Sequence, residues 1–349
     1  MHTHSSPLVA WTTKGLYCEA GGFYIDPHRA VDLAIVTHAH SDHARRGSKK
    51  YICESSGIEL LKTRLGQNIQ VQGFKYGECF SLGDVQVSLH SAGHILGSAQ
   101  VRIQRGHDVW VASGDYKRDR DPSCEPFESV QCDTFITEAT FGTPKYTWQK
   151  DVDHGQMIAE WWMSAKASNK NCILFGYSLG KAQRILAELA SHATQPILVH
   201  PSIIDLTECY RRQGRQLAPI ENIETRILEL EHHAKLQGEL ILAPPSIMKS
   251  KILPYLGRYE TAFASGWMQN SSRGFSYGGY DRGFVMSDHA DWNDLNQTIR
   301  ETKASRVFVQ HRNGALVKHL KSSGIEAFPV EDLAPDRYEA TGGYNLRLL

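Results

Sequence analysis

Histidine and aspartate are concentrated in one short segment of the chain. The segment is His38-Ala39-His40-Ser41-Asp42-His43, and one residue, Thr37, separates it from the apolar run 33–36. Four side chains that can bind metal, within six residues, cannot share one face of a regular strand or helix, but a tight turn separates them into two groups. Imidazole nitrogen and carboxylate oxygen are ligands that zinc and manganese accept. We therefore predict that His38 and His40 bind one divalent ion and that Asp42 and His43 bind a second; the alternative is a polar turn.

Three more candidate ligands follow predicted strands further along the chain. They are His94 after Val85–His90, Asp115 after Val109–Ser113, and His311 after Arg306–Gln310. Each residue alone would more often be a cap or a hydrogen-bonded core residue. Their repeated position at strand ends instead predicts a binuclear site, in which the two oxygens of Asp115 bridge the ions. Asp26, in Tyr24-Ile25-Asp26-Pro27, is predicted to orient a ligand histidine and not to bind metal itself.

Hydrophobic periodicity indicates the elements that must position these residues. The predicted strands are Ala34–Thr37, Val85–His90, Val109–Ser113, Thr134–Thr137, Cys172–Phe175, Ile197–His200, Glu239–Ala243, Gly283–Ser287 and Arg306–Gln310. The predicted helices are Ser56–Leu65, His154–Ala167, Gly180–Ala190, Glu221–Leu236, Trp292–Thr302 and Ala315–Ser323. The first 140 residues are rich in strands, and from about residue 154 strands and helices alternate, which favours an α/β fold with a parallel sheet.

Composition limits the class of protein. The 349 residues carry 38 basic and 38 acidic side chains, so the chain has no net positive charge. The overall composition therefore gives no indication of a nucleic-acid partner. No apolar run is long enough to span a bilayer, and no secretory signal is evident. Seven scattered cysteines without a C-x-x-C pair fit reduced thiols. We expect a soluble cytoplasmic protein without a membrane partner.

The order of these motifs resembles the metallo-β-lactamase fold hydrolases. Thr137-Glu138-Ala139-Thr140-Phe141-Gly142 and Ser287-Asp288-His289-Ala290-Asp291 resemble two motifs of the β-CASP nucleases, and His311 resembles their last histidine. The likeness covers essentially the whole chain. The likeness is strongest to the bacterial exonucleases associated with DNA ligase and helicase. The segments that carry it are 15–18, 21–27, 180–184, 265–268 and 287–292. One departure is that Arg312 and Asn313 separate His311 from Gly314, where many relatives have the glycine directly after the histidine.

The resemblance implies an αββα sandwich interrupted by an inserted domain. The expected domains are 1–140 and 283–349 for the metallo-β-lactamase part, and 141–282 for the β-CASP-like insertion. It also implies that His38, His40, His94 and Asp115 bind one ion, and that Asp42, His43, Asp115 and His311 bind the other. His289 is then the candidate general acid, with Glu138 orienting it. The alternatives are a turn-capping role for Glu138 and a helix-terminal histidine at 289.

Four further residues are candidates for binding a substrate phosphate. Lys181 and Arg184 follow Gly180 at a predicted helix start, and Ser265-Gly266 offers a hydroxyl and an open amide. The two cations alternatively solvate a helix face. The expected function is a two-metal DNA exonuclease in DNA repair, acting on single-stranded or end-containing DNA from the 5′ end, with a DNA ligase and helicase as partners. The alternatives are an RNA-processing β-CASP nuclease, a small-molecule metallo-hydrolase and a non-catalytic scaffold.

Overall fold

The computed structural model describes residues 7–231, 234–271, 279–310 and 314–335. The chain forms two compact units. The first contains residues 1–118, 126–147 and 290–349, and the second contains 119–125 and 148–289. We predicted domain changes after residues 140 and 282, whereas the compact units change after 147 and 289. The short piece 119–125 was not predicted to belong with the second unit.

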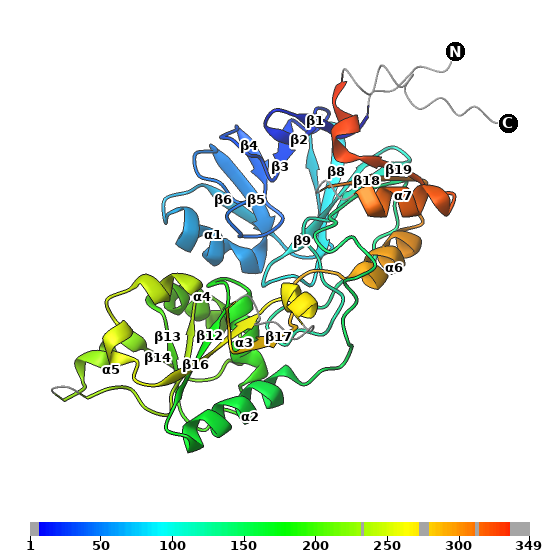
Figure 1. The fold of residues 1–349 in the computed structure, drawn as a ribbon. Coiled ribbons are helices and arrows are strands. Elements are labelled where there is room, and N and C mark those ends of the chain that lie inside the picture. The colour runs from blue at the N-terminus through cyan, green and yellow to red at the C-terminus, as the bar shows by residue number, and fades with distance from the viewer. Residues whose placement is uncertain (1–6, 232–233, 272–278, 311–313, 336–349) are drawn as a thin grey trace, which may run out of the picture. The chain divides into compact units, whose positions relative to one another are not determined.

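Two mixed sheets form the centre of the first unit (Figure 1). In spatial order, one sheet contains β1 (Ala10–Thr12), β2 (Gly15–Cys18), β3 (Phe23–Ile25), β4 (Leu33–Ile35), β5 (Lys50–Glu54) and β6 (Val71–Phe74). The other contains β19 (Glu326–Pro329), β18 (Arg306–Val309), β11 (Thr134–Thr137), β10 (Asp108–Ala112), β9 (Ala99–Arg105), β8 (Val85–Ser91) and β7 (Cys79–Leu82).

Alternation along the strands explains the layers of this unit. Trp110 and Ala112 of β10 pack into the core between the two sheets, whereas Val111 points to the opposite face. On that face α6 (Trp292–Thr302) and α7 (Gly314–Ser322) contribute Leu295 and Leu316 to a second core. The helix α1 (Ile58–Leu65), after the 3₁₀ turn Ser55–Gly57, lies beside β5 and β6 (Figure 1). The helices α6 and α7 thus cover the outer face of the second sheet.

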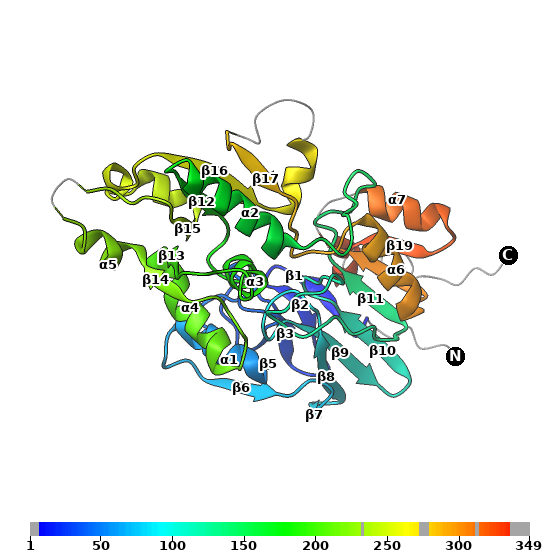
Figure 2. The ribbon, with the colours of Figure 1, turned by 90° about the horizontal axis from the view of Figure 1, so that it is seen from below.

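The second unit has one sheet of parallel strands (Figure 2). Its spatial order is β14 (Ile220–Asn222), β13 (Ile197–Val199), β15 (Leu240–Ala243), β12 (Asn171–Phe175), β16 (Tyr259–Ala264) and β17 (Arg282–Phe284). Cys172 and Leu174 of β12 face one core, and Ile173 and Phe175 face another. Because both faces are covered, the strands are continuous apolar runs.

Helices cover both faces of this parallel sheet. The helices α2 (His154–Ala167), α3 (Lys181–Glu188) and α4 (Pro201–Arg212) pack on one face, and α5 (Ile223–Leu228) and the 3₁₀ helices Pro245–Lys249 and Leu253–Tyr255 pack on the other. A further 3₁₀ helix, Gly266–Ser271, follows β16, and Val330–Leu333 follows β19 in the first unit. The predicted α/β class is confirmed.

Several predicted elements differ from the structure. The predicted helix Glu221–Leu236 is wrong in extent, because only 223–228 is helical within the described part of that range. The helix α4 was missed, although Pro201 at its first turn is a typical start signal. All seven cysteines are free thiols. Among the described residues, every helix is too short or too polar to cross a membrane.

Candidate metal centre

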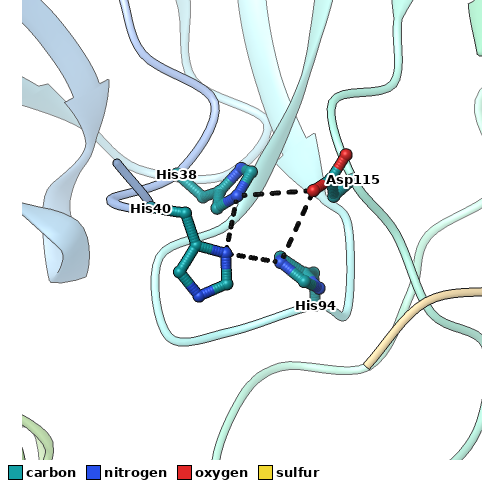
Figure 3. Close-up of side chains that lie close together, drawn as sticks. All are labelled: His38, His40, His94 and Asp115. Atoms are coloured by element: carbon teal, nitrogen blue, oxygen red, sulfur yellow. Dashed lines mark hydrogen bonds and ion pairs between the residues drawn. The ribbon is translucent and has the colours of Figure 1, made fainter. Parts of the chain in front are cut away.

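Three imidazoles of the first unit converge on one point. Nδ1 of His40 lies 3.0 Å from Nε2 of His38 and 3.0 Å from Nε2 of His94. Oδ2 of Asp115 lies 3.7 Å from the His38 nitrogen and 3.9 Å from the His94 nitrogen (Figure 3). Nitrogens that each lie about 2.1 Å from one zinc ion are about 3.0–3.4 Å apart, so this set has the spacing of a metal-ligand shell. Three of the four residues are buried, and His40 is partly exposed.

Short loops at strand ends bring these ligands together. The segment that carries His38 and His40 follows β4, and Asp115 follows β10. Gly114 has a φ of 55°, and a Cβ there would lie 2.7 Å from the Thr37 side chain. A side chain at 114 would therefore separate the loop of Asp115 from the loop of the histidines.

The loop after β8 positions His94 just as tightly. The Ser98 hydroxyl accepts hydrogen bonds from the backbone N–H groups of His94 (3.0 Å) and Ile95 (3.2 Å). Gly93 has a φ of 69°, and a Cβ there would lie 2.4 Å from the Lys117 carbonyl oxygen. Only glycine fits such a position without moving the backbone.

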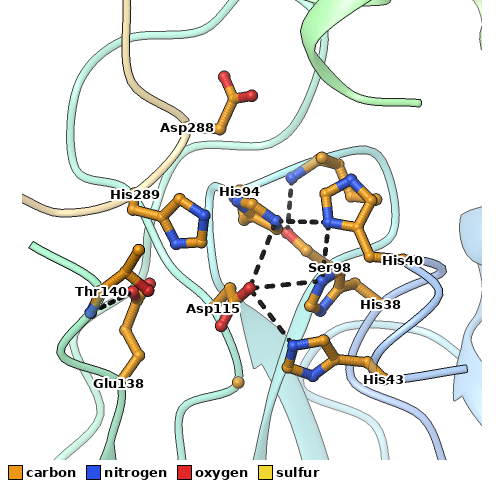
Figure 4. A network of polar contacts seen from close by, with 12 residues as sticks. His38, His40, His43, His94, Ser98, Asp115, Glu138, Thr140, Asp288 and His289 are labelled. Atoms are coloured by element: carbon orange, nitrogen blue, oxygen red, sulfur yellow. Dashed lines mark hydrogen bonds and ion pairs between the residues drawn. The ribbon is translucent and has the colours of Figure 1, made fainter. Parts of the chain in front are cut away.

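His43 contacts Asp115 and lies beside His38, with 4.0 Å between the two ring centroids (Figure 4). Its Nε2 is 3.3 Å from Oδ2 of Asp115 and 3.7 Å from Oδ2 of Asp42. The side chain of Asp42 is 69% exposed, whereas that of Asp115 is 7% exposed. Oδ2 of Asp115 is therefore within 3.9 Å of ring nitrogens of His38, His94 and His43, so one carboxylate oxygen faces both predicted sets of ligands. His311, the remaining predicted ligand, lies outside the described residues.

Asp26 contacts His43 and the loop that carries the first histidines. Oδ2 of Asp26 is 2.7 Å from Nδ1 of His43 and accepts a hydrogen bond from the Thr37 hydroxyl at 2.5 Å. Oδ1 accepts a second bond from the Thr37 backbone N–H at 2.8 Å. Asp26 itself has a φ of 43°, which is unusual for a residue with a side chain. The contacts suit a carboxylate that orients a ligand imidazole through its other nitrogen.

The two histidines nearest Asp115 have opposite pKa shifts. Burial and the neighbouring imidazoles His43, His94 and His40 lower the pKa of His38 well below its usual value. Burial also opposes the charge of His43, but the carboxylates of Asp115 and Asp26 outweigh it and raise its pKa well above the usual value. The lowered pKa of His38 favours the neutral ring, whose lone pair can bind a metal, whereas the raised pKa of His43 makes metal binding there compete with a proton.

Glu138 supports the backbone next to Asp115. Its carboxylate is fully buried, and Oε1 accepts a hydrogen bond from the Tyr116 backbone N–H at 2.7 Å. Oε2 accepts a longer bond from the Thr140 N–H at 3.4 Å. Glu138 belongs to the first unit and His289 is the last residue of the second. The predicted action of Glu138 on His289 therefore remains a prediction.

The predicted phosphate-binding residues lie at the carboxyl ends of β12 and β16 in the second unit. Lys181 and Arg184 are only 3% and 4% exposed and contact Asp288, as described below. A direct phosphate contact would require breaking these buried interactions. Ser265 is also buried, and its hydroxyl accepts a hydrogen bond from the Trp267 N–H at 3.3 Å, beside Gly266.

Sequence reasoning missed two kinds of supporting residue. One is Thr37, which lies directly before the first histidine and binds Asp26. The other is the pair of buried carboxylates Asp121 and Asp288, which face Arg184. The position of Thr37, a polar residue directly before a predicted ligand, could have indicated its supporting role. Nothing in the local pattern around 121 indicated its partner.

The fold is shared with a solved structure of distant sequence. A protein of unknown function from Enterococcus faecalis V583 superposes with a TM-score of 0.54 over 79% of this chain and 74% of that chain, at 12% identity. That likeness concerns the fold alone. No protein-family model matches the chain.

Curated relatives were found by sequence. A probable DNA ligase of Opitutus terrae is 30% identical over 92% of this chain and 31% of its own length. A ribonuclease of Thermus thermophilus is 26% identical over 49% of this chain and 45% of its own length. An RNase J-like protein of Methanocaldococcus jannaschii is 26% identical over 57% of this chain and 55% of its own length. The chain thus spans about a third of the first relative and about half of the other two. Its curated relatives include nucleases.

Proposed function

We propose that the chain is a metal-dependent phosphodiesterase of the metallo-β-lactamase/β-CASP nuclease class. The observation that carries this proposal is the convergence of His38, His40, His94 and Asp115, with His43 also in contact with Asp115. The relatives named as ribonucleases support the reaction class. Two divalent ions, zinc or manganese, would neutralise charge on the phosphodiester and supply a nucleophilic hydroxide at neutral pH.

The residues of the chain have separate tasks in this proposal. His38, His40 and His94 bind one ion, Asp42, His43 and His311 bind the other, and Asp115 is shared. Asp26 holds His43 in the ring orientation that directs Nε2 toward Asp115. Glu138 fixes the backbone that follows Asp115.

In the hydrolysis step, water first loses a proton to solvent, the oxygen of the resulting hydroxide bonds to phosphorus, and the P–O3′ bond breaks. His289 donates a proton to the departing O3′, and the products are a 3′-hydroxyl and a 5′-phosphate. We propose His289 because its imidazole is only partly buried, while the neighbouring Ser287 and Asp288 are buried and fix the backbone.

We propose DNA as the substrate, in an exonuclease of the kind associated with DNA ligase. The relative that aligns with almost the whole chain is named a probable DNA ligase, and it is about three times as long, so this chain corresponds to one part of it. A DNA ligase and helicase are then proposed functional partners. RNA is the second candidate substrate, because the ribonuclease relatives align with about half of the chain.

Parallel assays separate these possibilities. The purified protein is incubated with manganese and with end-labelled single-stranded DNA, single-stranded RNA of the same sequence, or a simple thioester. The proposal predicts hydrolysis of the DNA, with the thioester unchanged. Preference for RNA would make the chain an RNA-processing nuclease. Hydrolysis of the thioester alone would replace the phosphodiesterase proposal with a small-molecule hydrolase.

A further inference from the structure

Two buried cations contact the three residues before His289, which are Met286, Ser287 and Asp288. Lys181 donates from Nζ to the Met286 carbonyl and, at 2.8 Å, to Oδ1 of Asp288. Arg184 donates to the Ser287 carbonyl, and its Nη1 is 3.5 Å from Oδ1 of Asp288. Lys181 and Arg184 are on the first turn of α3, and the segment 286–289 follows β17. All of these groups belong to the second unit.

The cluster contains two cations and three carboxylates, and solvent is largely excluded from it. The side chains of Lys181 and Asp288 are 3% and 9% exposed, and those of Arg184 and Asp121 are 5% and 3% exposed. Nε of Arg184 is 3.7 Å from Asp121 and 3.7 Å from Glu188. Removing one member of a buried ion pair leaves its partner uncompensated, so the contacts of Lys181 and Arg184 with Asp288 favour a single arrangement of the segment.

The segment has no regular secondary structure to hold it. β17 ends at Phe284 and α6 begins at Trp292. The Ser287 hydroxyl accepts a bond from the His289 N–H at 3.1 Å and donates to the His289 carbonyl at 3.0 Å. Trp148 donates from Nε1 to the same carbonyl at 3.3 Å. The His289 backbone is thus fixed on both sides, while its imidazole remains partly exposed.

We infer that Lys181, Arg184 and Asp288 are positioning residues that hold His289 in place for proton transfer to the leaving oxygen. This inference rests on the proposed function. In it, Lys181 and Arg184 bind Asp288 of the protein and do not bind a substrate phosphate. A proton donor is effective only within hydrogen-bond reach of the leaving oxygen, so a loosened loop loses this contribution first.

Two substrates with different leaving groups can distinguish a role in positioning the general acid from a role in the stability of the fold. An oligonucleotide O3′ departs as a poor leaving group and needs the proton. The p-nitrophenolate of the p-nitrophenyl ester of thymidine 5′-phosphate departs without one. We therefore compare kcat on single-stranded DNA and on this ester for Lys181→Met, Asp288→Asn, the double variant and His289→Ala. Each protein is the full chain loaded with manganese, and its metal content and circular dichroism are recorded.

We expect Lys181→Met and Asp288→Asn to lower kcat on DNA by about tenfold or more, and to change kcat on the ester by less than about threefold. His289→Ala should show the same pattern with a larger loss on DNA. The double variant should lose less than the product of the two single losses, because both single variants break the contact between Lys181 and Asp288. Each single variant also removes one further contact, to the Met286 carbonyl or to Arg184. The double variant also keeps the charge balance, so it supports the comparison if a single variant fails to fold. Lys181→Arg, which retains the charge, should recover most of the DNA activity.

Lys170→Met is the matched control. Lys170 forms an ion pair of similar length with Glu260 in the same unit, 2.7 Å, but it precedes β12, whereas Lys181 follows that strand. The Lys170→Met variant should leave the ratio of kcat on DNA to kcat on the ester unchanged. Equal losses on both substrates in folded, metal-loaded variants, or no loss on DNA, would overturn the positioning role. A wild-type protein that hydrolyses neither substrate would instead refute the proposed function, and this inference with it.

Discussion

Oδ2 of Asp26 lies 2.7 Å from Nδ1 of His43, while Nε2 of the same ring faces Asp115 at 3.3 Å. One carboxylate thus contacts each nitrogen of a single imidazole. Asp26→Asn removes the charge but keeps the shape, so the fold should persist while metal affinity or activity falls by about 10–100-fold. Activity at limiting metal measures this effect. Asp32→Asn is the control, because Asp32 pairs with Lys49 at the surface. Unchanged activity at limiting metal would show that Asp26 only supports the loop.

Gly93 tests whether His94 depends on the tight loop that carries it. A Cβ at 93 would lie 2.4 Å from the Lys117 carbonyl and 2.9 Å from the Phe127 nitrogen. We expect Gly93→Ala to move the loop and lower the affinity for metal, as measured by competition with a chelator. Gly106 also has a positive φ, 61°, but a Cβ there meets nothing within 4 Å. Gly106→Ala therefore controls for backbone strain alone. Equal metal affinity in both variants would contradict the role of Gly93.

His154 should make stability depend on pH. Burial, followed by the charges of Arg184 and Lys181, lowers its pKa to about 4 from a usual value of 6.5. Between these values the unfolded chain binds a proton that the folded chain does not, so stability falls as pH decreases. The loss from this residue is about 2 kcal/mol between pH 7.5 and pH 5. Urea unfolding should show this loss, and His154→Phe, which has no titratable ring, should reduce it. Equal pH dependence in both proteins would refute the assignment.

A 5′-phosphate should accelerate digestion if the enzyme recognises a terminus. Ser265 and Gly266 follow β16 at the carboxyl edge of the parallel sheet, where anion sites commonly form. We expect faster digestion of 5′-phosphorylated than of 5′-hydroxyl single-stranded DNA, with a preference that shrinks as salt rises. Ser265→Ala should reduce the preference without changing metal content. Release of label first from the 3′ end, with no effect of 5′-phosphorylation, would reverse the proposed polarity.

The sequence predicted the longer elements and much of the candidate metal cluster for a clear physical reason. Long amphipathic segments carry a strong periodic signal, and the helices His154–Ala167 and Trp292–Thr302 have the predicted bounds. Ligands at strand ends are local features, and the structure brings His38, His40, His94 and Asp115 within 4.8 Å.

Features that depend on long-range pairing were not predictable in the same way. The strands β1 to β3 are only three or four residues long, so they carry little periodic signal. Lys181 and Arg184 resemble a solvated or phosphate-binding helix start in sequence. Their actual partners, Asp288 and Asp121, lie far from them along the chain and become visible only in the folded unit.

The most direct test of the account is a metal titration of the chelated protein, with hydrolysis of 5′-phosphorylated single-stranded DNA measured at each step. Since Asp115 contacts histidines of both predicted sets of ligands, we expect activity to rise with added manganese and to reach its maximum near two ions per chain. Asp115→Ala should bind less metal and have no activity. Full activity of the chelated protein, a maximum at one ion per chain, or an active Asp115→Ala variant would contradict the two-metal site.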